Sequence, residues 1–251
     1  MMQYLKSENL KFKRTFSRKL LIAVPLFNIG FSFFMNPSFL ITNTFNWWSI
    51  LFIPLTIAIL CALSHQKEQK AANYNGIFTL PVSLSTIWYS KTIIIALYMF
   101  IMLTFFVVMM MVISMVLPGN SISYIKIIEA SAVLWLSTLW QIPFCLFLAK
   151  RWGFVVTLVV NIAGGFLLGI ALATQSQWWI SPWSWSIRMM SPIVGVHPNG
   201  VPLPVGSPLW NLQVVPVGLA LSICFFVIVT LCSASSFNRV ATAYLKKQGG
   251  I

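Results

Sequence analysis

The chain has 251 residues, of which 59% are hydrophobic and 8% are charged, whereas soluble domains carry about 25% charged residues. This composition excludes a water-soluble globular protein. Sixteen Lys and Arg residues face only three acids, Glu8, Glu68 and Glu129, and the sequence has no Asp. Catalysis by paired carboxylates and a Walker-B magnesium site are therefore excluded as well.

The net charge of +13 is compatible with binding either to nucleic acid or to a membrane surface. The cations border apolar runs, as cytoplasmic Lys and Arg do in membrane proteins, so we expect no nucleic-acid partner. Each of the four cysteines lies inside an apolar run, and His65 and His197 are far apart in the sequence. We therefore expect no metal site, no cofactor and no catalytic residue.

Stretches of membrane-spanning length set the expected fold. A helix needs about 20 residues to cross about 30 Å of hydrocarbon. Six stretches qualify, at about 20–40, 47–63, 92–117, 127–149, 154–173 and 213–232. The sequence thus predicts an all-α, polytopic membrane protein with six transmembrane helices in residues 20–251.

The distribution of cations sets the expected orientation. With the N-terminus inside, every Lys and Arg except Lys126 and Arg188 falls in a cytoplasmic segment. Membrane proteins carry an excess of positive residues in their cytoplasmic loops. We therefore expect a multi-pass protein of the cytoplasmic membrane with both termini in the cytoplasm, a cytoplasmic loop at 64–91 and an extracellular loop at 174–212.

Residues 1–19 form a basic amphipathic segment before the first span. On a helix, Leu5, Phe12 and Phe16 share one face, and cations such as Lys11 occupy the others. Such a segment lies along the inner membrane surface. Two roles remain open: an anchor that supplies positive charge, or an elbow helix that packs against the bundle.

The predicted cytoplasmic loop 64–91 is longer than a helix connection requires. It holds an acid, then a Gly, then Leu-Pro-Val-Ser, and a Lys opens the next span. This order resembles the coupling segment of ABC-2-type permeases, the membrane halves of a class of ABC exporters. The positions that carry the resemblance are Glu68, Gly76, Leu80, Pro81, Val82, Ser83 and Lys91. The resemblance implies that Glu68, Gly76, Leu80, Pro81 and Lys91 couple the chain to an ATPase.

The predicted outer loop 174–212 strengthens and narrows the resemblance. Its Pro182-Trp183-Ser184 element, Pro192 and its His197-Pro198-Asn199-Gly200 element are similar to elements in the permease subunits of lantibiotic immunity transporters. The resemblance implies an exporter that expels a cationic antimicrobial peptide from the cytoplasmic membrane. It also implies a Gram-positive bacterium that makes the peptide or resists it.

Trp183, Trp185, His197 and Asn199 are candidate substrate contacts in this loop. The structural alternative is that the tryptophans form a belt at the membrane surface and that Pro-Asn-Gly forms a turn. The loop has no carboxylate and carries Arg188. Recognition of a cationic peptide here would therefore depend on aromatic and apolar contact, or on a partner subunit.

Glu129, near the outer end of the fourth span, is a further candidate contact. An ionisable group near the hydrocarbon is a functional-site hypothesis by default. Lys126 lies three residues earlier, on the same helical face, so an ordinary interfacial ion pair is the alternative.

Active transport needs an energy source that this chain does not encode. The sequence has no G-x-x-x-x-G-K-[ST] phosphate loop, which an ATPase would need. We therefore expect no enzymatic activity in this chain and ATP hydrolysis on a separate ATPase subunit. The resemblance implies two copies of that ATPase and a second, different permease subunit in a heterodimer, with a homodimer as the alternative.

Two other functions remain open at this point. One is an ABC-2 exporter of another lipophilic cargo, such as a bacitracin-like peptide, a drug or an ion. The other is a membrane scaffold without a transport role. A killing assay across several compounds separates the cargoes, and copurification with an ATPase separates the scaffold.

Overall fold

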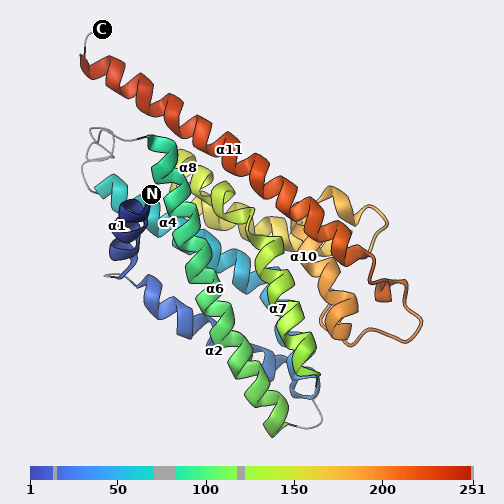
Figure 1. Ribbon diagram of the computed structural model, residues 1–251. Helices are drawn as coiled ribbons and strands as arrows, with labels where there is room; N and C mark the ends of the chain where they lie inside the picture. The colour runs from blue at the N-terminus through green and yellow to red at the C-terminus, as the bar shows by residue number, and fades with distance from the viewer. Residues whose placement is uncertain (14–15, 71–82, 118–121, 250–251) are drawn as a thin grey trace.

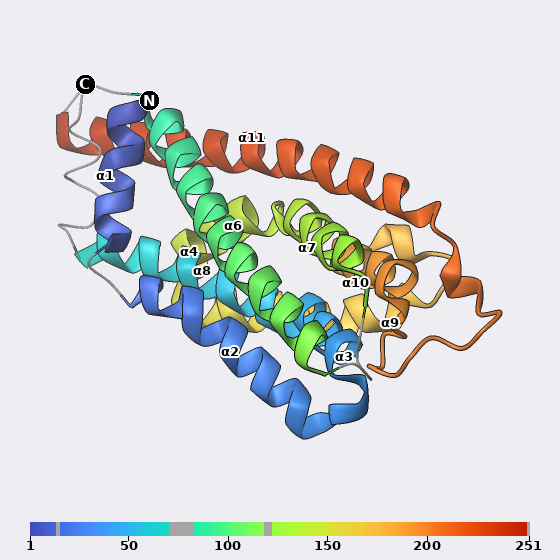
Figure 2. The ribbon, with the colours of Figure 1, turned by 60° about the horizontal axis from the view of Figure 1, so that its bottom comes forward.

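The computed structural model describes residues 1–13, 16–70, 83–117 and 122–249. These residues are helical apart from short connections, and they form no strand beyond one isolated bridge between Val196 and Pro202. Both termini lie at one end of an elongated helical bundle (Figures 1 and 2). The expectation of an all-α fold is confirmed.

The helices in chain order are α1 (Met2–Lys13), α2 (Ser17–Met35), α3 (Leu40–Trp47), α4 (Ile53–Lys70), α6 (Leu84–Val116), α7 (Tyr124–Thr138), α8 (Gln141–Ala163), α9 (Ile170–Ala173), α10 (Pro182–Met190) and α11 (Val214–Gly249). Short 3-10 and π-helical turns join several of them. One π turn, Trp48–Phe52, makes α3 and α4 a single helical run. Five runs are long and apolar enough to cross a membrane: Ser17–Met35, Pro37–Lys70, Leu84–Val116, Tyr124–Ala173 and Val214–Arg239.

The run Tyr124–Ala173 accounts for two crossings. Its 50 residues would extend about 75 Å as one straight helix, far beyond about 30 Å of hydrocarbon. At Gly153 the backbone leaves the helical region, with φ +83° and ψ −170°. Asn161 Nδ2 donates to Gln141 Oε1 at 3.0 Å, although about 30 Å would separate them on a straight helix. The chain therefore turns back at Gly153, and the expected spans 127–149 and 154–173 are the two arms of this hairpin.

Several helices differ in length from the predicted spans. The first ends at Met35, and the last runs on to Gly249. The second run extends beyond 47–63 at both ends, and the third begins at Leu84, before the predicted start at 92. Buried polar residues such as Asn46, Glu68 and Lys91 lie in or beside these added turns, where the apolar runs of the sequence stop.

The first predicted loop, 64–91, is shorter than expected, and the second, 174–212, is folded. Helix α4 continues to Lys70 and α6 begins at Leu84, so only 71–83 joins them; of this stretch only residue 83 is described. The region 174–212 contains helix α10, most of whose side chains are buried. It is a folded cap on the bundle, not an open loop.

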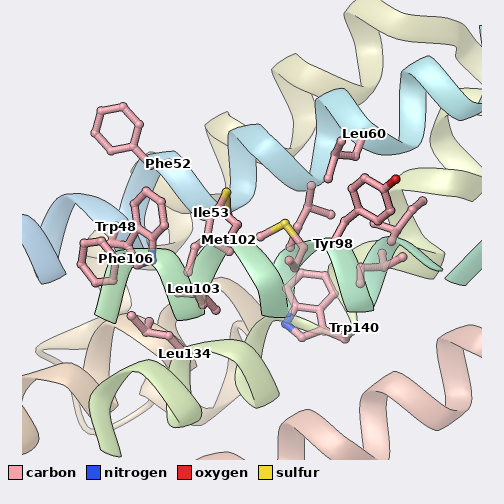
Figure 3. Close-up of a cluster of buried hydrophobic side chains, with 14 of the residues drawn as sticks. Trp48, Phe52, Ile53, Leu60, Tyr98, Met102, Leu103, Phe106, Leu134 and Trp140 are labelled. Atoms are coloured by element: carbon pink, nitrogen blue, oxygen red, sulfur yellow. The ribbon is translucent and has the colours of Figure 1, made fainter. Parts of the chain in front are cut away.

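The core lies between α3, α4, α6, α7 and the first arm of α8 (Figure 3). Trp48 and Phe106 stack there with ring centroids 4.7 Å apart, and Trp140 lies further along the same core. Such aromatic pairs contribute beyond the area they bury. This packing fixes α4 against α6 and so determines what meets at their ends.

Candidate functional site

Four charged side chains meet at the end of the bundle that carries both termini. Glu8 and Lys11 come from α1, Glu68 from the last turns of α4, and Lys91 from the second turn of α6. Lys91 Nζ lies 2.9 Å from Glu8 Oε2 and 2.6 Å from Glu68 Oε1. Lys11 Nζ lies 2.6 Å from Glu8 Oε1 and 2.5 Å from Glu68 Oε1. Each lysine thus bridges both acids, and we call these four residues the ion cluster.

The ion cluster is largely removed from solvent. Glu8, Glu68 and Lys91 are buried, with Lys91 only 3% exposed. Moving single charges out of water is expensive, but alternating charges with hydrogen bonds compensate one another. Burial alone would lower the pKa of Lys11, but the nearby charges and hydrogen bonds of Glu8 and Glu68 raise it overall. Lys11 therefore stays protonated at neutral pH.

Further contacts hold α1 against the bundle beside the ion cluster. The Lys67 ammonium donates to the Lys11 carbonyl at the end of α1. Tyr98 Oη donates to Asn9 Oδ1 at 3.1 Å, and the Tyr98 ring lies 5.0 Å from that of buried Phe12. The first helix is thus bound to α4 and α6 by apolar and polar contacts together.

The structure brings together two of the five residues expected at the coupling segment. Glu68 and Lys91 are in direct contact, although 23 positions separate them in the sequence. Gly76, Leu80 and Pro81 lie outside the described residues. This contact joins the end of α4 to the first turns of α6.

Sequence reasoning missed two members of the ion cluster, Glu8 and Lys11. Their spacing of three residues on an amphipathic helix was a usable signal for an ion pair. The scarcity of acids was a second signal, because each of only three carboxylates must be placed among many cations. Neither signal identifies α4 and α6 as the partners of α1, since that contact is tertiary.

At the opposite end, Trp183 and Trp185 on α10 are packed among helices. Trp183 Nε1 donates to Asn161 Oδ1 at 3.1 Å, and its ring lies 5.2 Å from that of Trp140. A Cβ on Gly164 would approach the Trp183 ring to 2.2 Å, so glycine is required there. Trp185 is 4% exposed, and its Nε1 donates to the Trp179 carbonyl at 2.8 Å.

His197 and Asn199 form a tight turn on the same end. The Asn199 backbone N–H donates to His197 Nδ1 at 3.3 Å, and Gly200 closes the turn with φ +93°. Asn46 of α3 donates to the Pro198 carbonyl at 3.3 Å and holds the turn on the bundle. Asn199 is exposed and His197 half-buried.

The remaining charges near this end are not paired with one another. Glu129 and Lys126 are both exposed on α7, and no ion pair joins them in the structure. Arg188 is buried in α10 and donates to the Leu209 carbonyl at 2.9 Å. Within the described ranges, no three His, Cys, Asp or Glu side chains gather as a metal site.

Comparison with known proteins assigns the family. Residues 4–176, more than half of the chain, match the family described as ABC-2 family transporter protein. The chain belongs to the ABC-2 transporter family. The matched region of this ABC-2 protein begins in α1 and ends just after α9, so it includes all four residues of the ion cluster and both arms of the hairpin. No curated protein and no solved structure matches the chain.

Membership of this family identifies the chain as a membrane component of a transporter. The apolar helical runs agree with that assignment. Helices α10 and α11, and the residues between them, lie outside the matched region.

Proposed function

We propose that this ABC-2 protein is the permease subunit of an exporter that expels a lantibiotic from the cytoplasmic membrane and so gives self-immunity or resistance. Family membership supports the transport role. The elements Pro182-Trp183-Ser184 and His197-Pro198-Asn199-Gly200, which resemble those of lantibiotic immunity permeases, support the cargo.

The family implies that an ATPase subunit is the partner. In the proposal, two copies of the ATPase dock from the cytoplasm on the segment 64–91, and a second permease subunit completes a heterodimer. Both termini lie at the end of the bundle where α4 and α6 approach that segment (Figure 1). The excess of cations at this end supports its cytoplasmic placement.

The ion cluster is the observation that carries the coupling role. Glu68 and Lys91 lie in the two helical ends of the docking segment, in α4 and α6. Each contacts α1, Glu68 through Lys11 and Lys91 through Glu8. A displacement of the segment by the ATPase therefore moves α4, α6 and α1 together. Since α4 and α6 also form the core, the movement reaches the hairpin and opens a lateral path for the peptide.

On the outer end, the candidate contacts divide into two kinds. Asn199 and Glu129 are exposed, and His197 is half-buried beside Asn199, so these three can touch a peptide held at the membrane surface. Trp183 and Trp185 are packed inside the cap. They contribute to the proposal by positioning α10.

Cells that express the chain with its ATPase and second permease subunit test the proposal. They should survive a lantibiotic better than cells without the chain, and should gain no comparable protection from a bacitracin-like peptide or a drug. Protection from those compounds alone would overturn the lantibiotic cargo. Failure of any ATPase to copurify with the chain would favour the scaffold and overturn the transport proposal.

Coupling is tested with Glu68→Gln and Pro81→Ala, and with Lys126→Gln as a matched control. Both coupling variants should insert in the membrane and keep ATP hydrolysis while immunity is lost. Glu68→Gln also removes a partner of Lys11 and Lys91, whereas Pro81→Ala removes no member of the ion cluster and so tests coupling separately from stability. The control should retain immunity, since Lys126 is exposed at the far end of α7. Unchanged immunity in both coupling variants would exclude this segment as the site of coupling.

A further inference from the structure

A groove runs between α11 and the first arm of α8, and no residue of the ion cluster lines it. One cavity of about 390 Å³ is lined by Trp88, Phe147, Lys150, Arg151, Ser233, Ser236 and Phe237. It shares Phe147, Ser233 and Ser236 with a cavity of about 370 Å³, and Ser236 with a cavity of about 450 Å³ that reaches Arg239. The three cavities thus adjoin one another along α11, with Ser236 in the wall of each, and we call them together the groove.

The groove is polar at one end and apolar at the other. Arg151 and Arg239 are exposed at the end near the termini, where Lys150 Nζ lies 4.0 Å from the centroid of the Phe237 ring. Toward the middle of the bundle the walls are apolar, with Phe144, Ile228 and Val229. Cations therefore border the groove where the membrane-spanning stretches end, and hydrocarbon side chains line its deeper part.

The acids of this chain all lie elsewhere. Glu8 and Glu68 belong to the ion cluster with Lys11 and Lys91. Glu129 lies on α7, about 30 Å along the helices from Lys150 at 1.5 Å per residue. The sequence has no other Asp or Glu. None of the three acidic side chains lines the groove, so the arginines are open to a negative group from another molecule.

One occupant has both properties that the groove requires. A phospholipid with a net negative headgroup carries charge at the membrane surface and acyl chains in the hydrocarbon. Basic pockets between transmembrane helices at the cytoplasmic face suit such headgroups. A cationic peptide is repelled by the same residues, so the groove is unsuited to the proposed cargo.

We propose that the groove between α8 and α11 is a binding site for an anionic phospholipid. The headgroup phosphate lies against Arg151 and Arg239, beside Lys150, and one acyl chain lies along Phe144, Ile228 and Val229. Through this site, the lipid composition of one leaflet affects how α11 packs against the hairpin. It is independent of which cargo the transporter carries.

Native mass spectrometry of the purified full chain in detergent tests the site, with phosphatidylglycerol and phosphatidylcholine of identical acyl chains as probes. The wild type should bind one phosphatidylglycerol in preference to phosphatidylcholine. Arg151→Gln with Arg239→Gln should weaken that binding about 25-fold, since each cation near a membrane surface contributes roughly fivefold. Both arginines are exposed, so the double variant should keep the thermal midpoint of the wild type.

Two further variants separate charge from shape. Lys126→Gln removes a cation at the opposite end and should leave lipid binding unchanged. Ser236→Phe keeps every cation but fills the point where the cavities meet, and should weaken phosphatidylglycerol binding.

Four outcomes would overturn the proposal. The first is equal binding of the two lipids. The second is undiminished phosphatidylglycerol binding by the double arginine variant. The third is displacement of the lipid by inorganic phosphate alone, which would indicate a free-anion site. The fourth is a double variant that loses the ATPase subunit but binds lipid normally, which would indicate an acidic protein partner.

Discussion

Lys91 is the residue at which the sequence and the tertiary structure give different interpretations. In the sequence it opens a predicted span and resembles any cation at a membrane surface. In the structure it is 3% exposed and bonded to Glu8 and Glu68. A buried ammonium with two carboxylates is stable only while both partners are present, because each charge offsets the desolvation of the others. The contribution of Lys91 to the stability of the protein is therefore lost if either carboxylate is removed.

Lys91→Met should destabilise the protein by about 3–5 kcal/mol, because it leaves two buried carboxylates with one lysine. Lys126→Met, at an exposed position, should change stability by less than about 0.5 kcal/mol. Thermal unfolding of the purified chain in detergent measures both.

A second variant distinguishes charge from packing in that experiment. Adding Glu8→Gln to Lys91→Met removes one of the uncompensated charges and should recover part of the lost stability. Equal thermal midpoints for the single and double variants would show that the ion cluster is not electrostatically coupled.

At the scale of elements, the hairpin of α8 shows how one backbone conformation determines topology. Gly153 adopts φ +83° and ψ −170°, a combination that is essentially restricted to glycine. This turn brings Asn161 back to Gln141 and Pro54, with Trp183 of α10 on its other side. The polar groups of Asn161 thus join α4, both arms of α8 and α10 inside the bundle.

Gly153→Ala should destabilise the hairpin by about 1–3 kcal/mol through backbone strain. Gly30→Ala is the matched control, because a Cβ at either glycine meets nothing within 4 Å. Gly30 lies inside helix α2, where alanine is favoured over glycine by up to about 1 kcal/mol. Opposite shifts of the thermal midpoint are expected, and a shift of the same sign in both variants would contradict the strain argument.

At the scale of the whole molecule, the bundle has two different polar ends. Both termini lie at one end (Figure 2). This end carries the ion cluster and the cationic end of the groove. The other end carries the cap with α10 and the turn at His197. In the proposed mechanism, a movement at the first end reaches the second through the core between α4 and α6.

Cysteine labelling in intact cells tests the proposed orientation. Val205→Cys, at a fully exposed position of the cap, should react with a membrane-impermeant maleimide added outside. Lys70→Cys, exposed at the end of α4, should react only after the cells are opened. The wild type, with its four native cysteines, supplies the background signal. Labelling of Lys70→Cys from outside would place the proposed ATPase-coupling end outside the cell and overturn the proposed orientation.

Much of the fold could be predicted from apolar length, and less of the site could. The hairpin arms matched the expected spans at 127–149 and 154–173, because Gly153 follows a basic pair that interrupts the apolar run. The ends of α4 and α6 were misplaced because Glu68 and Lys91 are polar and buried together. The sequence did not predict helix α10 for a similar reason, because Ser184 and Arg188 are polar yet buried.

The sequence by itself determined that this protein is a helical membrane bundle, because apolar runs of spanning length and a scarcity of charge have few other solutions. It also carried the pattern that pointed to the ABC-2 family. Only the tertiary structure decided which charges meet, since Glu8, Glu68 and Lys91 are distant along the chain and become neighbours through packing of α1 on α4 and α6. It likewise decided that Trp183 and Trp185 are interior residues, because the burial of a side chain depends on what the rest of the chain places around it.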